Sequence, residues 1–299
     1  MKTLVTGANG YIGLRLIPSL LEAGHQVVAM VRDKNRFPSD QFDSFAEDER
    51  FSLIEGDMLR PESLPEFPND IDAAYYLLHS MAAGGDFESR EADCATNFIA
   101  WIASSACARI LYLGGLIPNA PLSDHLESRE NVNRILRSSS IPVTTLRASI
   151  IVGSGSASFE IIRDLAEKLP FMITPSWTRT RCQPIAIRNV IAYLTRCLDT
   201  PETKGREFDI GGPEILTYRN LLEQYAEARK LHRLIISVPL LTPRLSAHWL
   251  HFITATTIQL AKSLIDSLTN ETICRDDSIT ELIPQELLSY REAIEKAFA

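Results

Sequence analysis

The stretch Thr6-Gly7-Ala8-Asn9-Gly10-Tyr11-Ile12-Gly13 sets the fold of this chain. A short β-branched run at residues 2–6 leads directly into this turn, and apolar residues at helical spacing follow it as far as residue 23. Glycines between a strand and a helix allow unusual backbone torsions, and they let the amides that open the helix approach a diphosphate. The stretch therefore predicts the first β-α unit of a Rossmann-type fold that binds a dinucleotide.

The rest of the first half repeats this alternation. Strands are predicted at residues 2–6, 26–31, 51–55, 73–78, 109–113 and 142–147, and helices at 11–23, 88–105 and 124–138. Such alternation predicts an α/β fold, in which a doubly wound parallel sheet carries helices on both faces. Gly24 suits a left-handed stop for the first helix, and Asp124 with Glu127 suits a capping box for the third.

The second half is less regular. A Gly-Ser loop from residue 153 precedes a helix near 158–168, a strand at 207–210, a helix at 217–229, a strand at 234–238 and an apolar helical region at 244–268. We expect a nucleotide-binding core at residues 1–152, to which a segment near 184–213 returns. Residues 153–183 and 214–299 are expected to form a smaller C-terminal lobe.

Composition narrows the class of protein. The chain has 299 residues, of which 45% are hydrophobic and 23% are charged, so it has the composition of a folded protein. A formal charge of −8 gives no basic surface for nucleic acid. No apolar run approaches the length of a membrane span. Five cysteines without a Cys-x-x-Cys pair, and a first strand that starts almost at Met1, predict reduced thiols, no metal site and a cytoplasmic location.

Residues after the second and third strands bear on the choice of cofactor. Arg32 stands where a carboxylate would bind the ribose of NAD, and a guanidinium there favours the 2′-phosphate of NADP. Asp33 is the alternative, because a slip of one residue would place it on the ribose. In Gly56-Asp57-Met58, the carboxylate is a candidate partner for the adenine amino group, and Met58 is a candidate to pack on the ring.

These residues together resemble the short-chain dehydrogenase/reductase superfamily, and more narrowly its extended and atypical branch. The nearest likeness is to a nucleoside-diphosphate-sugar-epimerase-like group related to NmrA-like proteins and the 39-kDa subunit of complex I. It rests on the glycine turn, Tyr112-Leu-Gly-Gly-Leu116, Leu146-Arg147-Ala-Ser-Ile-Ile151 and Gln183-Pro-Ile-Ala-Ile187, and it extends over nearly the whole chain. The resemblance implies an NAD(P)-binding site, and Arg32 favours NADP(H) over NAD in it. The cofactor-binding residues expected are Gly7, Asn9, Gly10, Tyr11, Ile12, Gly13, Arg32, Asp57, Met58, Leu78, His79, Gly114, Ala148 and Ser149.

The proton donor of that superfamily is missing. Its reductases use a Tyr whose pKa is lowered by a Lys four residues later, and no tyrosine of this chain has such a Lys. His125 and Arg129 fall at the two positions, on one helix face because they are four residues apart. Three alternatives follow: His125 with Arg129 acts in catalysis, the two lie on a solvated face with Glu127 and Glu130, or His79 or Ser80 acts instead.

The resemblance leaves the activity open between classes. The first expectation is an oxidoreductase that reduces a small carbonyl or unsaturated substrate, with Arg147 and Ser154 as candidate substrate-binding residues. The equal alternative for Arg147 is that it braces the loop after the sixth strand. The second is a non-catalytic NAD(P)-binding module that senses the redox state or assists the assembly of a protein partner. A nucleotide-sugar epimerase is the third. The expected partner is thus a small molecule or a protein, and not a nucleic acid.

Overall fold

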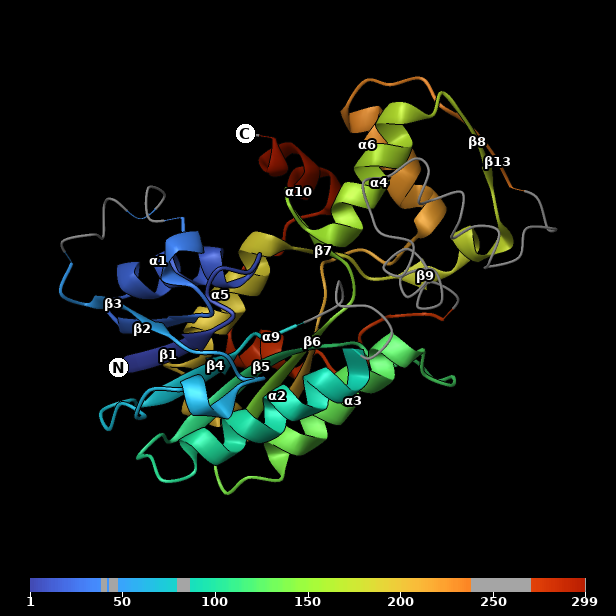
Figure 1. Cartoon of the computed structure of the whole chain (residues 1–299). Helices are drawn as coiled ribbons and strands as arrows, with labels where there is room; N and C mark the ends of the chain where they lie inside the picture. Colours follow the sequence, from blue (N-terminus) through green and yellow to red (C-terminus); the bar gives the residue numbers. More distant parts are fainter. Residues whose placement is uncertain (39–41, 43–47, 80–86, 238–269, 299) are drawn as a thin grey trace.

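A seven-stranded parallel sheet forms the centre of the molecule in the computed structural model, which describes residues 1–38, 42, 48–79, 87–237 and 270–298 (Figure 1). The strand order is β11-β6-β5-β4-β1-β2-β3, and every pairing is parallel. The strands are β1 (Lys2–Thr6), β2 (Gln26–Val31), β3 (Phe51–Glu55), β4 (Ala73–Tyr76), β5 (Arg109–Gly115), β6 (Val143–Ala148) and β11 (Glu207–Ile210). The predicted doubly wound α/β fold is confirmed.

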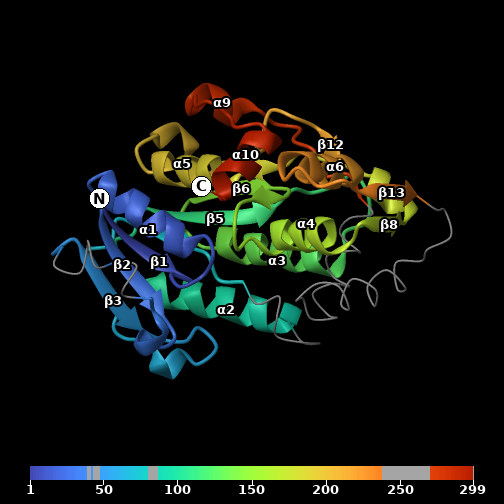
Figure 2. The same ribbon diagram turned by 90° about the horizontal axis from the view of Figure 1, so that it is seen from above.

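Helices cover both faces of this sheet (Figures 1 and 2). Helices α1 (Gly13–Glu22) and α5 (Ile187–Cys197) pack on one face, and α2 (Phe87–Ile102) and α3 (Asp124–Arg137) pack on the other. Side chains alternate between the faces of a strand, so Val5 and Tyr75 join the α1/α5 cluster while Leu4 and Tyr76 join the α2/α3 cluster.

The helix ends bear out one prediction and correct another. Gly24 has a φ of +84°, the left-handed conformation expected after α1. The capping box predicted from Asp124 and Glu127 is wrong. Ser123 is the N-cap of α3, because its backbone is still extended and its hydroxyl accepts a hydrogen bond from the amide of Leu126. The two acidic residues lie in the first helical turn instead.

A third hydrophobic cluster is formed by residues that follow β6 in the chain. It is built from α4 (Ala157–Lys168), α6 (Tyr218–Ala228), α10 (Tyr290–Ala297) and strands β8 (Phe171–Thr174) and β13 (Leu234–Ser237). The remaining short elements are β7 (Ile151–Val152), β9 (Arg181–Cys182), β10 (Ile185–Ala186), β12 (Leu216–Thr217) and α9 (Ser278–Leu282). Within the described residues, every helix is too short or too polar to cross a bilayer.

Between the segments that form the third cluster, the chain returns to the central sheet. Helix α5 packs against α1, and β11 pairs with β6 at the edge of the central sheet. Arg109, buried at the start of β5, donates hydrogen bonds to the carbonyl of Cys197 and to the hydroxyls of Thr144 and Thr203. The domain limits stay a prediction, and the predicted helical region at 244–268 lies outside the described residues.

Candidate functional site

A pocket of about 330 Å³ lies at the carboxyl ends of β1, β2, β3 and β4. Ligands of open α/β sheets bind at this edge. The pocket is lined by Gly7, Asn9, Gly10, Met30, Val31, Arg32, Gly56, Asp57, Met58, Leu59, Leu77, Leu78, His79 and Cys94. Eight of the fourteen cofactor-binding residues expected from the sequence are among them, so the structure brings most of the expected site together.

The glycine turn comes very close to the backbone that follows β4. Gly7 has a φ of +66°, and a Cβ there would lie 2.6 Å from the carbonyl oxygen of Leu77. A Cβ on Gly13 would lie 2.6 Å from the carbonyl oxygen of Gly7. The Thr6 hydroxyl, which donates to the carbonyl of Tyr75 at 3.0 Å, ties the two strand ends together. Only glycine therefore suits these positions of the turn.

The opening of α1 suits an anion. Its N-cap residue, Ile12, has no side chain that accepts a hydrogen bond from the helix, and its first turn holds no acidic residue. Backbone N–H groups at a helix start need an acceptor, and the helix dipole adds a partial positive charge there. The amides of Leu14 and Arg15 already donate to the carbonyls of Gly10 and Ile12, so a diphosphate would be held by the amides that precede them in the turn.

The two candidates for the ribose differ in what their side chains do. Arg32 is exposed and lines the pocket. The carboxylate of Asp33 accepts a hydrogen bond from the amide of Asn35 at 2.9 Å, where it caps a short 3-10 turn. Arg32 therefore lines the pocket, whereas Asp33, whose Oδ1 caps this turn, does not.

The loop after β3 is held by hydrogen bonds within itself and by one from α2. The carboxylate of Asp57 accepts from the amide of Leu59 at 3.0 Å and from the guanidinium of Arg60 at 3.3 Å. Met58 is only 2% exposed, and its carbonyl accepts from the Nδ2 of Asn97 at 2.7 Å. These contacts hold Asp57 and Met58 in place at the adenine end of the expected site, and Cys94 of α2 lines the pocket beside them.

A buried polar network begins at His79. Its Nδ1 lies 2.6 Å from Oε1 of Glu91, and the Ser128 hydroxyl donates to Oε2 of the same carboxylate at 2.6 Å. The side chain of Glu91 is only 5% exposed. Burial is the main cause that lowers the pKa of His79, and the charge of Arg129 adds to it, while Glu91 opposes both. The surroundings of His79 therefore favour its neutral imidazole form.

His125 and Arg129 lie against this network. The rings of His79 and His125 are 5.2 Å apart, centre to centre. Within the described residues, Nδ1 of His125 and Nε of Arg129 are buried without a hydrogen-bond partner. Burial, the charge of Arg129 and the neighbouring His79 lower the pKa of His125 to about 3. One alternative from the sequence placed His125 and Arg129 on a solvated helix face. The structure instead buries atoms of both side chains.

The other predicted residues lie away from this pocket's lining. Arg147 forms ion pairs with Asp209 at 2.8 Å and Glu207 at 3.5 Å, so it braces β6 against β11. Ser149 shares a 2.6 Å hydrogen bond with Thr272. Outside the lining are also Tyr11, Ile12 and Gly13 in the turn, Gly114 and Ala148 at the ends of β5 and β6, and Ser154, which lines a different cavity. Ser80 lies outside the described residues.

Sequence reasoning missed Glu91, Ser128 and Cys94. A signal for Glu91 was present, because it falls on the apolar stripe of α2 with Cys94, Phe98 and Ile102. A carboxylate on such a stripe needs a buried partner, and the partners are on other elements. Among the described residues, no group of three or more acidic, His or Cys side chains is placed to hold a metal.

The sheet, the glycine turn and the pocket beside it define a dinucleotide-binding α/β protein. Residues 7–169 match the family model described as NAD(P)H-binding, and the chain belongs to that family. The predicted resemblance to the atypical short-chain dehydrogenase/reductase group is confirmed.

The proteins that this chain is similar to have different named functions. The chain is 26% identical over 246 residues to the photosystem II assembly factor Ycf39 of Trieres chinensis, which covers 76% of this chain and 69% of that protein. In fold it resembles triphenylmethane reductase of Citrobacter sp. complexed with NADP(H), with a TM-score of 0.77 and 16% identity over 99% of this chain and 100% of that one. A nucleoside-diphosphate-sugar epimerase from Staphylococcus aureus has the same TM-score, 0.77, 16% identity and the same coverage, 99% and 100%. The two structural likenesses establish the fold alone.

Proposed function

We propose that this chain is an NADP(H)-dependent reductase that acts on small, electron-poor carbonyl or conjugated substrates. The observation that carries the proposal is the pocket at the glycine turn, which Arg32 lines and Asp33 does not. The opening of α1 would hold the diphosphate, and Arg32 would hold the 2′-phosphate. Bound NADPH would supply the hydride. The reductase from Citrobacter, whose structure contains NADP(H), supports this assignment by its similar fold.

The buried network narrows the class of substrate. The Nδ1–H of His79 donates to Glu91, so in the neutral ring Nε2 carries no proton. The pKa of His125 is lowered to about 3, so its ring is neutral as well. Neither ring is then a strong acid at pH 7. A simple ketone needs a proton as hydride arrives, whereas a conjugated acceptor spreads the new charge and takes its proton from water afterwards.

Arg129 adds a fixed positive charge beside the two rings. Its guanidinium donates to the carbonyl of Leu113 at 3.2 Å, and its own carbonyl accepts from the Tyr112 hydroxyl at 3.0 Å, so it is anchored at both ends. A fixed cation stabilises the anion that forms on an acceptor after hydride addition. In this proposal Arg129 stabilises that charge, and His79 and Glu91 orient the acceptor.

A second candidate function is a non-catalytic NAD(P)H-binding module that assists the assembly of a protein partner. Apolar side chains of β8 and β13 favour it, because Phe171 and Leu234 are paired neighbours that are 47% and 58% exposed. Exposed apolar patches are typical of interaction surfaces. The similarity to an assembly factor points the same way. An epimerase is the weaker alternative, because its Tyr-Lys pair has no counterpart here. A cytoplasmic location is part of this proposal.

Cofactor titrations test the proposal. We expect the chain to bind NADPH more tightly than NADH, and Arg32→Ala to weaken NADPH binding by about 1 to 3 kcal/mol, the range for a charge-assisted contact, with little effect on NADH. Lys34→Ala is the matched control, since Lys34 is a nearby cation outside the pocket lining. Equal losses for both cofactors would contradict the phosphate role of Arg32.

Turnover separates the two functions. NADPH consumption should be faster with quinones and enones than with simple ketones. Glu91→Gln should lower the rate and leave NADPH affinity unchanged, because Glu91 does not line the pocket. Tight NADPH binding without oxidation by any member of such a panel would contradict the reductase and favour the assembly module.

A further inference from the structure

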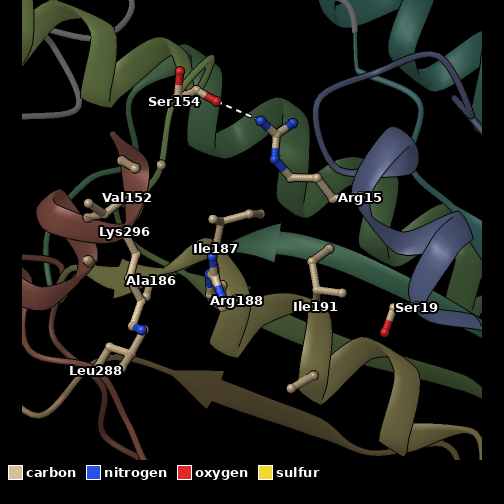
Figure 3. A pocket seen from close by; sticks show the side chains of 14 residues that line it. Arg15, Ser19, Val152, Ser154, Ala186, Ile187, Arg188, Ile191, Leu288 and Lys296 are labelled. Atoms are coloured by element: carbon tan, nitrogen blue, oxygen red, sulfur yellow. Dashed lines mark hydrogen bonds between the residues drawn. The ribbon is translucent and has the colours of Figure 1, made fainter. Parts of the chain in front are cut away.

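A second pocket of about 430 Å³ lies between α1, α5, α10 and the loop after β7 (Figure 3). Its volume is within the range of small-molecule sites. The described residues that line it and those that line the first pocket have no member in common. The second pocket is lined by Arg15, Ser19, Val152, Gly153, Ser154, Ala186, Ile187, Arg188, Ile191, Ala192, Leu288, Ala293, Lys296 and Ala297.

Three cations surround this pocket, one from each of three helices. They are Arg15 of α1, Arg188 of α5 and Lys296 of α10, and none of the described lining residues is acidic. Within the described part of the chain, neither Arg188 nor Lys296 forms an ion pair. The chain as a whole carries a formal charge of −8, so a group of cations without acids runs against its general composition.

Arg15 is held in place before any ligand arrives. Its guanidinium donates to the carbonyl of Tyr11 at 3.0 Å and to the carbonyl of Ser154 at 2.7 Å, the contact drawn in Figure 3. It also lies 4.1 Å from the centre of the Tyr11 ring. Both hydrogen bonds go to neutral oxygens, so its charge is not neutralised by them.

The wall between the cations is apolar. Val152, Ile191 and Ala293 are 1%, 8% and 4% exposed, and Ile187 and Leu288 are partly buried beside them. An inorganic anion would leave this wall in contact with water. A neutral apolar ligand would gain nothing from the three cations. The two features together require a molecule that has both an anionic group and an apolar body.

We infer that this pocket binds a small organic anion, with a carboxylate near Arg15, Arg188 and Lys296 and an aliphatic body against the apolar wall. The site is separate from the cofactor pocket and does not depend on the function proposed above. Octanoate is a suitable probe, because it combines a carboxylate with an aliphatic chain. Octan-1-ol keeps the chain without the charge, and acetate keeps the charge without the chain.

Calorimetric titration of the full chain tests this inference. Octanoate should bind at one site per chain, and octan-1-ol and acetate should each bind at least about tenfold more weakly, the factor that corresponds to one charged or apolar contribution. Equal affinities for octanoate and octan-1-ol would overturn the inference, since the cations would then contribute nothing.

Variants locate the site. Arg188→Gln combined with Lys296→Gln should weaken octanoate binding about tenfold. Arg291→Gln should not, because Arg291 is a cation of the same helix that pairs with Glu295 and does not line the pocket. Ala297→Trp, or Ala192→Trp if the first variant folds poorly, should fill the pocket and abolish binding. NADPH affinity should be unchanged in all of them. Octanoate binding that survives both tryptophan variants would overturn the site.

Discussion

The two pockets of this chain are built in opposite ways. The pocket at the glycine turn takes its shape from backbone, since Gly7 and Gly13 lie where a single Cβ would meet a carbonyl oxygen. The pocket between α1, α5 and α10 takes its shape from side chains, and its cations Arg188 and Lys296 are exposed. A site formed by backbone tolerates few substitutions, whereas a rim of exposed side chains can change while the fold stays intact.

Gly7→Ala should have the largest effect and would sharpen this contrast. The new Cβ would lie 2.6 Å from the carbonyl oxygen of Leu77, at a φ of +66°. We expect a loss of about 2 to 4 kcal/mol in the free energy of unfolding, and no measurable NADPH binding. Urea unfolding and a fluorescence titration measure the two effects.

Gly24→Ala is the control for backbone conformation alone. Gly24 also has a positive φ, +84°, but a Cβ there would meet nothing within 4 Å. Its cost should be about 1 to 2 kcal/mol, with NADPH binding retained. Equal losses of stability in the two variants would show that the close approach to Leu77 does not matter.

Acid should destabilise the protein through the buried histidines beside the first pocket. Below pH 6.5 the unfolded chain protonates His125, while the folded chain, whose pKa there is lowered to about 3, does not. Stability therefore falls as the pH falls, by up to about 1.4 kcal/mol per pH unit for this one proton. Around His125 stand the cation Arg129, the imidazole of His79 and the carboxylate of Glu91, and the lowered pKa of His79 acts in the same direction.

His125→Gln tests this effect, because it removes one titrating group from the network. Its free energy of unfolding, measured in urea from pH 7 to pH 4.5, should fall less steeply than that of the unaltered chain. The second pocket offers a contrast, since Arg188→Gln should leave the slope as it is. If the free energy of unfolding had the same pH dependence in His125→Gln and in the unaltered chain, His125 would have the same pKa in the folded and the unfolded protein.

Arg15→Gln should have the smallest effect on stability and NADPH binding. It tests whether the two pockets are independent of each other. Arg15 lines the second pocket, but it also donates to the carbonyl of Tyr11 in the glycine turn. We expect a loss of about 1 kcal/mol in stability and a change in NADPH affinity of less than threefold. Arg15→Lys keeps the charge and serves as the control. A tenfold loss of NADPH affinity would mean that the pockets are coupled through Arg15.

The sequence predicts the first pocket well because its signals are local. A glycine turn, a strand end at Arg32 and the Gly56-Asp57-Met58 loop each follow a strand, and parallel strands bring their carboxyl ends together. The same argument places Leu78 and His79 beside them. The sequence does not distinguish a glycine that lines the pocket, such as Gly7, from one that only packs within the turn, such as Gly13. Both positions require glycine.

The rest depends on tertiary packing. Glu91 meets His79 and Ser128 because α2 lies between the end of β4 and α3, which no single stretch of sequence indicates. The cations of the second pocket come from the beginning, the middle and the end of the chain. The N-cap at Ser123 is one residue from the prediction, because Ser and Asp both serve as caps and only the backbone torsion separates them.

The return of α5 and β11 to the central sheet has a consequence for how the protein is made. The first six strands of the sheet can pair as soon as they leave the ribosome, since all of them precede β7. The surface of α1 that contacts α5 stays open to water until α5 is synthesised, and β6 remains an unprotected edge until β11 follows it. During synthesis the half-made sheet is therefore the species most exposed to aggregation, and it stays so while the intervening α4 and β8 are added.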